Sequence, residues 1–127
     1  MSASKRKGSS WERRVVEFLA ANGHPRAERR VSNGVNDRGD LAGVDGWVVE
    51  MKSCKRVELA AWMDEAEKEA KSAGVARFAV VFPRRSHATA KAFAVVPLWL
   101  LAELMLPDDD GTRLAMTRPW VAGEVVA

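Results

Sequence analysis

The chain has 127 residues, 47% of them hydrophobic, and a formal net charge of +3. These values fit one globular domain with a sizeable core. The longest apolar run, residues 93–106, is interrupted by Pro97 and Glu103 and is too short to span a bilayer, so no membrane association is expected. The single cysteine, Cys54, excludes an internal disulfide, and we therefore expect a protein of the reducing cytoplasm.

The positive charge is concentrated in the first half of the chain. Residues 1–56 hold 12 Lys/Arg and 7 Asp/Glu, whereas residues 57–127 hold 8 Lys/Arg and 10 Asp/Glu. A basic half favours a polyanionic partner such as nucleic acid. A solvated basic surface without a partner is the alternative interpretation of the same charges.

The first predicted elements are a tail and a helix. Residues 1–8 are polar and basic, and we predict that they form a flexible tail. Ser9-x-x-Glu12 matches a capping box, the pattern in which two side chains satisfy the free N–H groups at a helix start. The pattern predicts a helix from Ser9 to Gly23, because glycine commonly ends helices.

Two strands and a second helix are predicted next. Short apolar segments at 40–44 and 47–53 are typical of strands. Apolar residues at helical spacing predict a helix over 58–73, ended by Gly74. Its charged residues are predicted to face solvent, namely Asp64, Glu65, Glu67, Lys68, Glu69 and Lys71.

The remaining pattern predicts strands over 76–82 and 92–96 and a helix over 97–106. The expected order is therefore α-β-β-α-β-β-α, an α/β fold with a mixed central sheet flanked by helices. We expect this fold to occupy residues 9–106, with residues 107–127 as a C-terminal extension.

The most informative stretch of the sequence contains Asp40 and the tripeptide from Glu50 to Lys52. Alternate residues of a strand share a face, so Glu50 and Lys52 should project together while Val49 and Met51 project oppositely. Carboxylates and an ammonium group held on sheet backbone suit a divalent metal ion and a phosphate.

Whether Asp40 shares the face of Glu50 depends on the loop between the two strands. A two-residue Asp45-Gly46 turn would direct Asp40 away from Glu50, because one residue of slip reverses every side chain. A three-residue loop over 44–46 would place Asp40 opposite Glu50, with Gly46 in the left-handed conformation. A metal site requires the second register.

In that register Asp40 and Glu50 would bind Mg²⁺ or Mn²⁺ through hard oxygen atoms. Lys52 would orient a water molecule or stabilise the charged transition state. The alternative is a surface strand with an ordinary Glu–Lys pair, which contributes little to stability.

Glu12 is a further candidate. On a helical repeat it aligns with Val16 and Leu19, inside the apolar arc of the first helix. A carboxylate that faces the protein interior needs a partner, since an unpaired buried charge is costly. A metal ion is one such partner, although Glu12 could serve as a capping residue as well.

Three segments together resemble the PD-(D/E)XK nuclease superfamily, and within it archaeal-type Holliday-junction resolvases and their phage relatives. The segments are Lys7-Gly8-Ser9-Ser10-Trp11-Glu12-Arg13, Arg38-Gly39-Asp40-Leu41 and Val48-Val49-Glu50-Met51-Lys52-Ser53. Gly39 stands where the family motif has proline. The resemblance implies a restriction-endonuclease-like fold and a homodimeric, Mg²⁺-dependent endodeoxyribonuclease of a bacterial or phage-infected cell, which cleaves four-way DNA junctions.

The resemblance also implies roles for single residues. Asp40, Glu50 and Glu12 would form the metal and catalytic acids, Lys52 would act in the chemical step, and Ser32 would lie near the scissile phosphate. The alternatives are a superfamily nuclease acting on ordinary duplex DNA, by nicking or restriction, and a non-catalytic nucleic-acid-binding module on the same fold. Basic residues expected to contact DNA phosphates are Lys5, Arg6, Lys7, Arg13, Arg29, Arg30, Arg38, Lys55, Arg84 and Arg85.

Overall fold

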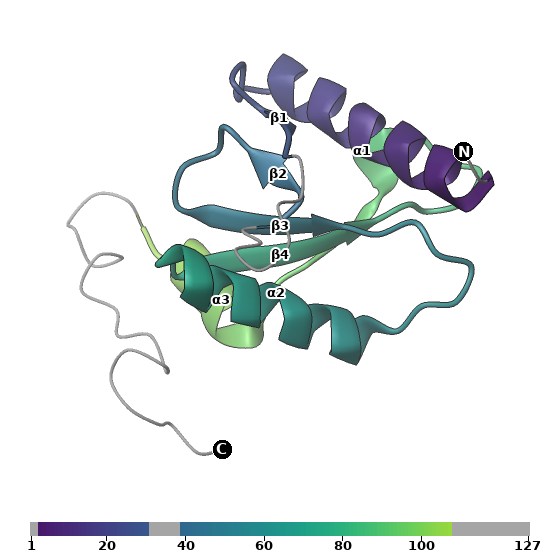
Figure 1. Ribbon diagram of the computed structural model, residues 1–127. Helices are drawn as coiled ribbons and strands as arrows, with labels where there is room; N and C mark the ends of the chain where they lie inside the picture. The colour runs from purple at the N-terminus through teal and green to yellow at the C-terminus, as the bar shows by residue number, and fades with distance from the viewer. Residues whose placement is uncertain (1–2, 31–38, 108–127) are drawn as a thin grey trace. The chain divides into compact units, whose positions relative to one another are not determined.

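The computed structural model describes residues 3–30 and 39–107 of the chain (Figure 1). This part of the protein is a mixed α/β structure with three α-helices and two small sheets. In chain order the elements are α1 (Ala3–Ala21), β1 (Glu28–Arg29), β2 (Leu41–Ala42), β3 (Trp47–Met51), α2 (Leu59–Ala73), β4 (Arg77–Phe82), the short 3₁₀ helix η1 (Thr89–Lys91), β5 (Phe93–Val95) and α3 (Leu98–Leu104).

The larger sheet has the strand order β3-β4-β5 and is mixed, as predicted. Strands β3 and β4 are parallel, with Glu50 level with Val80, and β5 runs antiparallel to β4. Parallel neighbours need a crossover connection, and α2 provides it. The smaller sheet pairs β1 with β2 in antiparallel register.

The chain forms two compact units that divide between Val95 and Val96. The first unit contains α1, α2, η1 and the five described strands, whereas α3 lies in the second. None of the described helices is both long enough and apolar enough to cross a lipid bilayer.

One side of the larger sheet packs against α1 (Figure 1). The alternation of β3 directs Val49 and Met51 to this side, where they join a buried cluster with Trp11 and Val15 of α1. The indole N–H of Trp11 donates a hydrogen bond to the carbonyl of Val81, at 3.3 Å. The predicted alternation of β3 is thus confirmed on its apolar side.

The other side of this sheet packs against α2. Trp62, Ala66 and Ala70 are buried there, at the spacing that predicted the helix. The rings of Trp62 and Phe82 meet edge to face, with centroids 5.6 Å apart. Gly74 ends α2 in the left-handed conformation, as expected. This packing fixes which residues of α2 face β3.

The predicted start of the first helix is wrong. Helix α1 begins at Ala3, so Ser9 lies within it and no capping box forms at the helix start. Residues 3–8, predicted as a flexible tail, are helical. Lysine, arginine and alanine favour helix, and their preference outweighs the cost of one interior glycine, about 1 kcal/mol.

The predicted pairing of the first two strands is also corrected. Strand β2 pairs with β1, and Asp40, just before β2, donates its backbone N–H to the Val49 carbonyl of β3 at 3.0 Å. Gly43, with φ +86°, passes against the carbonyl of Arg26, where a Cβ atom would clash. The absence of a side chain at Gly43 thus leaves room for the chain to pass Arg26 next to the paired strands. Gly46 has φ +83°, the left-handed conformation that the three-residue loop predicted.

Candidate metal centre

Strand β3 presents Glu50 to α2, opposite in direction to Val49 and Met51. The Glu50 side chain is only 3% exposed, and its Oε2 atom lies 3.8 Å from Nζ of Lys52. The prediction that Glu50 and Lys52 share a face is therefore confirmed.

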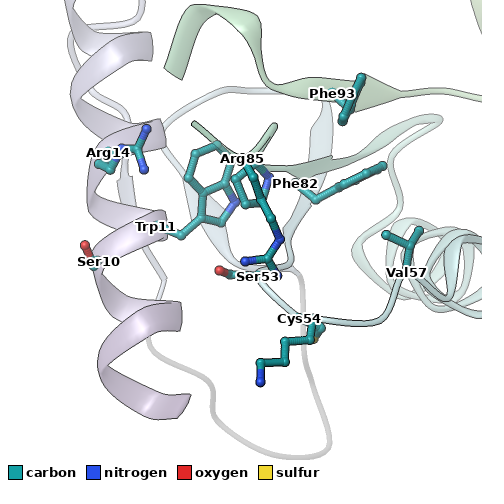
Figure 2. A pocket seen from close by; sticks show the side chains of 11 residues that line it. Ser10, Trp11, Arg14, Ser53, Cys54, Val57, Phe82, Arg85 and Phe93 are labelled. Atoms are coloured by element: carbon teal, nitrogen blue, oxygen red, sulfur yellow. The ribbon is translucent and has the colours of Figure 1, made fainter. Parts of the chain in front are cut away.

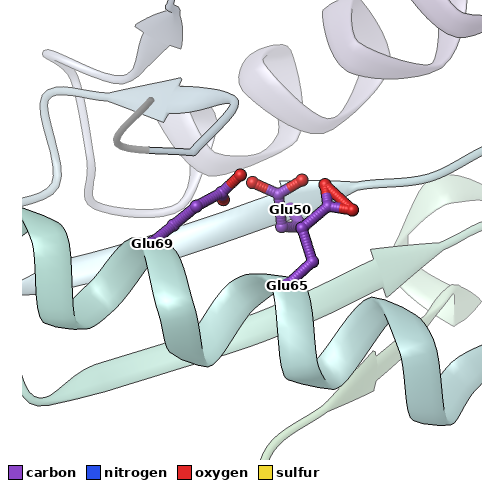
Figure 3. Close-up of side chains that lie close together, drawn as sticks. All are labelled: Glu50, Glu65 and Glu69. Atoms are coloured by element: carbon purple, nitrogen blue, oxygen red, sulfur yellow. The ribbon is translucent and has the colours of Figure 1, made fainter. Parts of the chain in front are cut away.

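Helix α2 brings two further carboxylates to Glu50 (Figure 3). Glu65 and Glu69 are one helical turn apart and so lie on the same face of the helix. One carboxylate oxygen from each of Glu50, Glu65 and Glu69 lies within 4.8 Å of the others, and we call this set the carboxylate group. Glu50 and Glu69 are buried, whereas Glu65 is exposed.

The surroundings of Glu50 disfavour its charged form. Burial, a hydrogen bond with Glu69 and the negative charges of Asp40, Glu69 and Glu65 raise the pKa of Glu50 from 4.5 to about 11. Its Oε1 atom is buried and has no hydrogen-bond partner among the described residues. Burying a polar atom without a partner costs free energy. A bound cation would interact with this oxygen and would reduce the repulsion among the neighbouring carboxylates.

Asp40 lies beside the carboxylate group without belonging to it. Its Oδ2 atom accepts a hydrogen bond from Met51 N–H at 2.8 Å, and its charge raises the pKa of both Glu50 and Lys52. The preceding Gly39 has φ +92°, and a Cβ atom there would lie 3.5 Å from Oε1 of Glu50 and 3.0 Å from the Val48 side chain. The bare backbone at this position lets the Asp40 segment approach β3 closely.

Lys52 is held by carboxylates from two elements. Its Nζ atom donates hydrogen bonds to both carboxylate oxygens of Glu65, each at 3.1 Å. Burial lowers the pKa of Lys52, but the Glu65 hydrogen bond and the charges of Glu65, Glu50 and Asp40 outweigh burial and raise it above 10.5. The direction of this shift favours the protonated form of Lys52.

The structure places Glu12 in a different setting. Its carboxylate forms an ion pair with Arg29 of β1, at 3.5 Å, and its side chain is 21% exposed. Val16 and Leu19, with which it was aligned, are partly buried against the cluster that contains Trp11, as the helical repeat predicted. The charges that act on Glu50 come from Asp40, Glu65 and Glu69, so a catalytic role for Glu12 stays a prediction.

The structure describes some of the remaining predicted site residues and shows how exposed they are. Ser32 and Arg38 lie outside the described residues, and Lys5, Arg6 and Lys7 are described only as part of the backbone of α1. Arg30 is half-buried. The exposed candidates are Arg13, Arg29, Lys55, Arg84 and Arg85.

Two residues of the carboxylate group were missed by the sequence prediction, which placed them on the solvent side of α2. Glu69 is buried at 7% exposure, and Glu65 contacts Lys52. The sequence did contain an indication of their position. Glu65 follows Trp62 by three positions and Glu69 follows Ala66 by three, and Trp62 and Ala66 belong to the apolar face of the helix. Both therefore border the face that packs on the sheet.

Comparison of the chain with known protein families, with curated proteins and with solved structures gives no match.

Proposed function

We propose that this protein is a metal-dependent endodeoxyribonuclease of the PD-(D/E)XK kind that cleaves branched DNA, foremost four-way junctions, as a homodimer. The observation that carries the proposal is the buried Oε1 atom of Glu50, which lacks a hydrogen-bond partner among the described residues and belongs to a group of three carboxylates. A protonated lysine lies 3.8 Å from the same carboxylate.

The donor set fits a hard divalent cation. Glu50 and the carboxylates of α2 offer only oxygen atoms, which Mg²⁺ and Mn²⁺ prefer, and Asp40 adds a negative charge nearby. A bound ion of this kind polarises a phosphate and lowers the pKa of a coordinated water molecule. Glu50 is the central ligand of this proposal, because its buried carboxylate faces both α2 and the Asp40 segment.

Lys52 would supply positive charge to the phosphate during cleavage. Its raised pKa keeps it protonated, and a fixed cation stabilises the negative charge that develops in the transition state. Glu65 restrains the lysine through two hydrogen bonds, which limits the reorganisation needed during the reaction.

The fold supports this proposal in its main features. Strand β3, which carries Glu50 and Lys52, lies between α1 and α2 and is joined to β4 by the crossover helix (Figure 1). We propose that this arrangement is a small version of the restriction-endonuclease-like core. A non-catalytic binding module is the less favoured alternative, because such a module has no need of a buried and mutually repelling carboxylate group.

The test is cleavage of a synthetic four-way junction beside its linear duplex arms, with Mg²⁺ and with EDTA. We expect the junction to be cut only with Mg²⁺, and Glu50→Gln and Asp40→Asn to abolish cutting while junction binding persists. Asp45→Asn is the matched control, because Asp45 is exposed and pairs with Arg26 away from the carboxylate group. Equal cutting of the duplex arms would favour the duplex nuclease, and junction binding without cutting under any divalent ion would favour the binding module.

A further inference from the structure

A cavity of about 340 Å³ opens beyond the end of β3, between α1 and the loop that leads to α2 (Figure 2). One wall is formed by Ser53, the residue after Lys52, and by the following loop that connects β3 to α2. Ser10, Trp11 and Arg14 line it from α1, and Phe82 and Phe93 line it from β4 and β5. Such a volume lies within the range of small-ligand pockets, about 300–1,000 Å³.

The charge of the cavity is positive. Arg14, Lys55 and Arg85 line it, and no aspartate or glutamate is among its described lining residues. All three cations are exposed, and within the part of the chain that the structure describes, none of them forms an ion pair with a carboxylate. Arg14 also donates a hydrogen bond to the Thr89 hydroxyl at 3.2 Å and lies over the Trp11 ring, so Lys55 and Arg85 are the cations most available to an anionic group.

The same cavity also carries apolar surface that a simple anion would leave uncovered. Phe93 and Val57 are 45% and 54% exposed, so both offer apolar surface to the cavity. The rings of Phe93 and Phe82 lie 5.3 Å apart and are tilted by 40°, and the Arg84 guanidinium lies 6.0 Å from the centre of the Phe93 ring. Aromatic rings beside phosphate-binding cations are the combination that binds single-stranded nucleotides.

The loop that carries Arg85 has a constrained conformation. Ser86 has φ +63°, a left-handed conformation that is uncommon for residues with a side chain. His87 N–H donates to the carbonyl of Arg84 at 3.1 Å, and the His87 ring nitrogen Nδ1 lies 2.9 Å from the carbonyl of Arg85. These contacts close a tight turn that presents Arg85 to the cavity, and backbone strain of this kind concentrates at binding sites.

We infer that this cavity binds one unpaired nucleotide of the DNA substrate, with its phosphate on the cations and its base against Phe93. The inference rests on the proposed function for the identity of the ligand, but none of the lining residues belongs to the carboxylate group. Because Ser53 directly follows Lys52, the bound nucleotide would lie next to the strand segment presented to the candidate catalytic residues. The site would thus select DNA with an unpaired or splayed base near the cleaved bond.

The test compares two single strands of equal length, oligo-dT and its abasic counterpart, bound to the full chain in EDTA. We expect the wild-type protein to bind oligo-dT about tenfold more tightly, the scale of stacking one base on an aromatic ring. Phe93→Leu should remove this preference, whereas Phe18→Leu should keep it, because Phe18 is a comparably exposed aromatic residue outside the cavity.

The role of the cations is tested by a second matched pair. Lys55→Ala should weaken binding of both strands, whereas its exposed neighbour Arg56, which does not line the cavity, should matter less. Equal wild-type affinity for the two strands, or equal losses in Lys55→Ala and Arg56→Ala, would overturn the inference. Base preference in a protein that never cleaves DNA would refute only the proposed nuclease activity, and cleavage without base preference would refute only the nucleotide site.

Discussion

Nζ of Lys52 lies 3.1 Å from both carboxylate oxygens of Glu65, a residue thirteen positions further along the chain. The contact joins the end of β3 to the middle of α2. Among the described residues, Lys52 is the cation that pairs with Glu50. Its position is restrained by α2, a helix that lies outside the sequence motif. In the proposed mechanism Glu65 would therefore position Lys52.

Removing the charge of Glu65 should reveal this role. We expect Glu65→Gln to slow single-turnover cleavage about 10- to 100-fold, the usual cost of losing a supporting partner beside a metal site. Asp64→Asn, an exposed neighbour on the same helix, should cleave like the wild type. A pH–rate profile distinguishes positioning from stability, because losing the carboxylate that raises the pKa of Lys52 should move the alkaline limb to lower pH.

Lys52 itself should act in the chemical step. We expect Lys52→Ala to lower the single-turnover rate by about two orders of magnitude or more, the scale of losing one preorganised charge-stabilising group. Lys68→Ala, which removes an exposed lysine from α2, is the control. If the loss in Lys52→Ala disappeared at saturating enzyme, Lys52 would be an ordinary phosphate contact.

The stability of the metal-free protein should depend on the proton at Glu50. Its pKa is raised from 4.5 to about 11 in the folded chain, so its contribution to stability is complete below its unfolded pKa and is lost as the pH rises. We expect the Tm in EDTA to fall between about pH 5 and pH 9, with a shallower fall for Glu50→Gln. Adding Mg²⁺ at the alkaline end should restore the Tm of the wild type and leave Glu50→Gln unchanged. A flat wild-type Tm would show that Glu50 does not couple to folding.

Glu12 can be tested separately from its ion pair. We expect Glu12→Gln to melt near the wild type, since a partly exposed ion pair contributes about 0–1 kcal/mol, yet to cleave at least tenfold more slowly. Arg29→Gln breaks the same pair and leaves Glu12 charged. Rates are compared at saturating protein, because Arg29 is also an expected DNA contact. If both variants then lose activity equally, the ion pair matters and Glu12 is not a catalytic acid; if neither loses activity, Glu12 is only a surface partner of Arg29.

Several features followed from the sequence because their causes are local. The apolar spacing of α2 and the glycine at position 74 predicted that helix and its end, and strand alternation placed Glu50 and Lys52 on one face. Local preference was misread at α1, where Ser9-x-x-Glu12 suggested a helix start inside a helix that begins at Ala3. A capping pattern shows only that its residues are able to cap a helix. Whether the helix begins there or extends further toward the N-terminus depends on the residues that precede the pattern.

The composition of the carboxylate group was decided by tertiary structure. Glu65 and Glu69 are separated from Glu50 by the whole β3–α2 connection, and they meet it only because α2 crosses back over β3 and β4. The pairing of β2 with β1 likewise joins segments that are separate in the chain, and it is compatible only with a small residue where Gly43 passes Arg26. The periodicity of a segment indicates which of its faces is apolar. Which element packs against that face depends on how the helices and strands assemble, and no single segment encodes that arrangement.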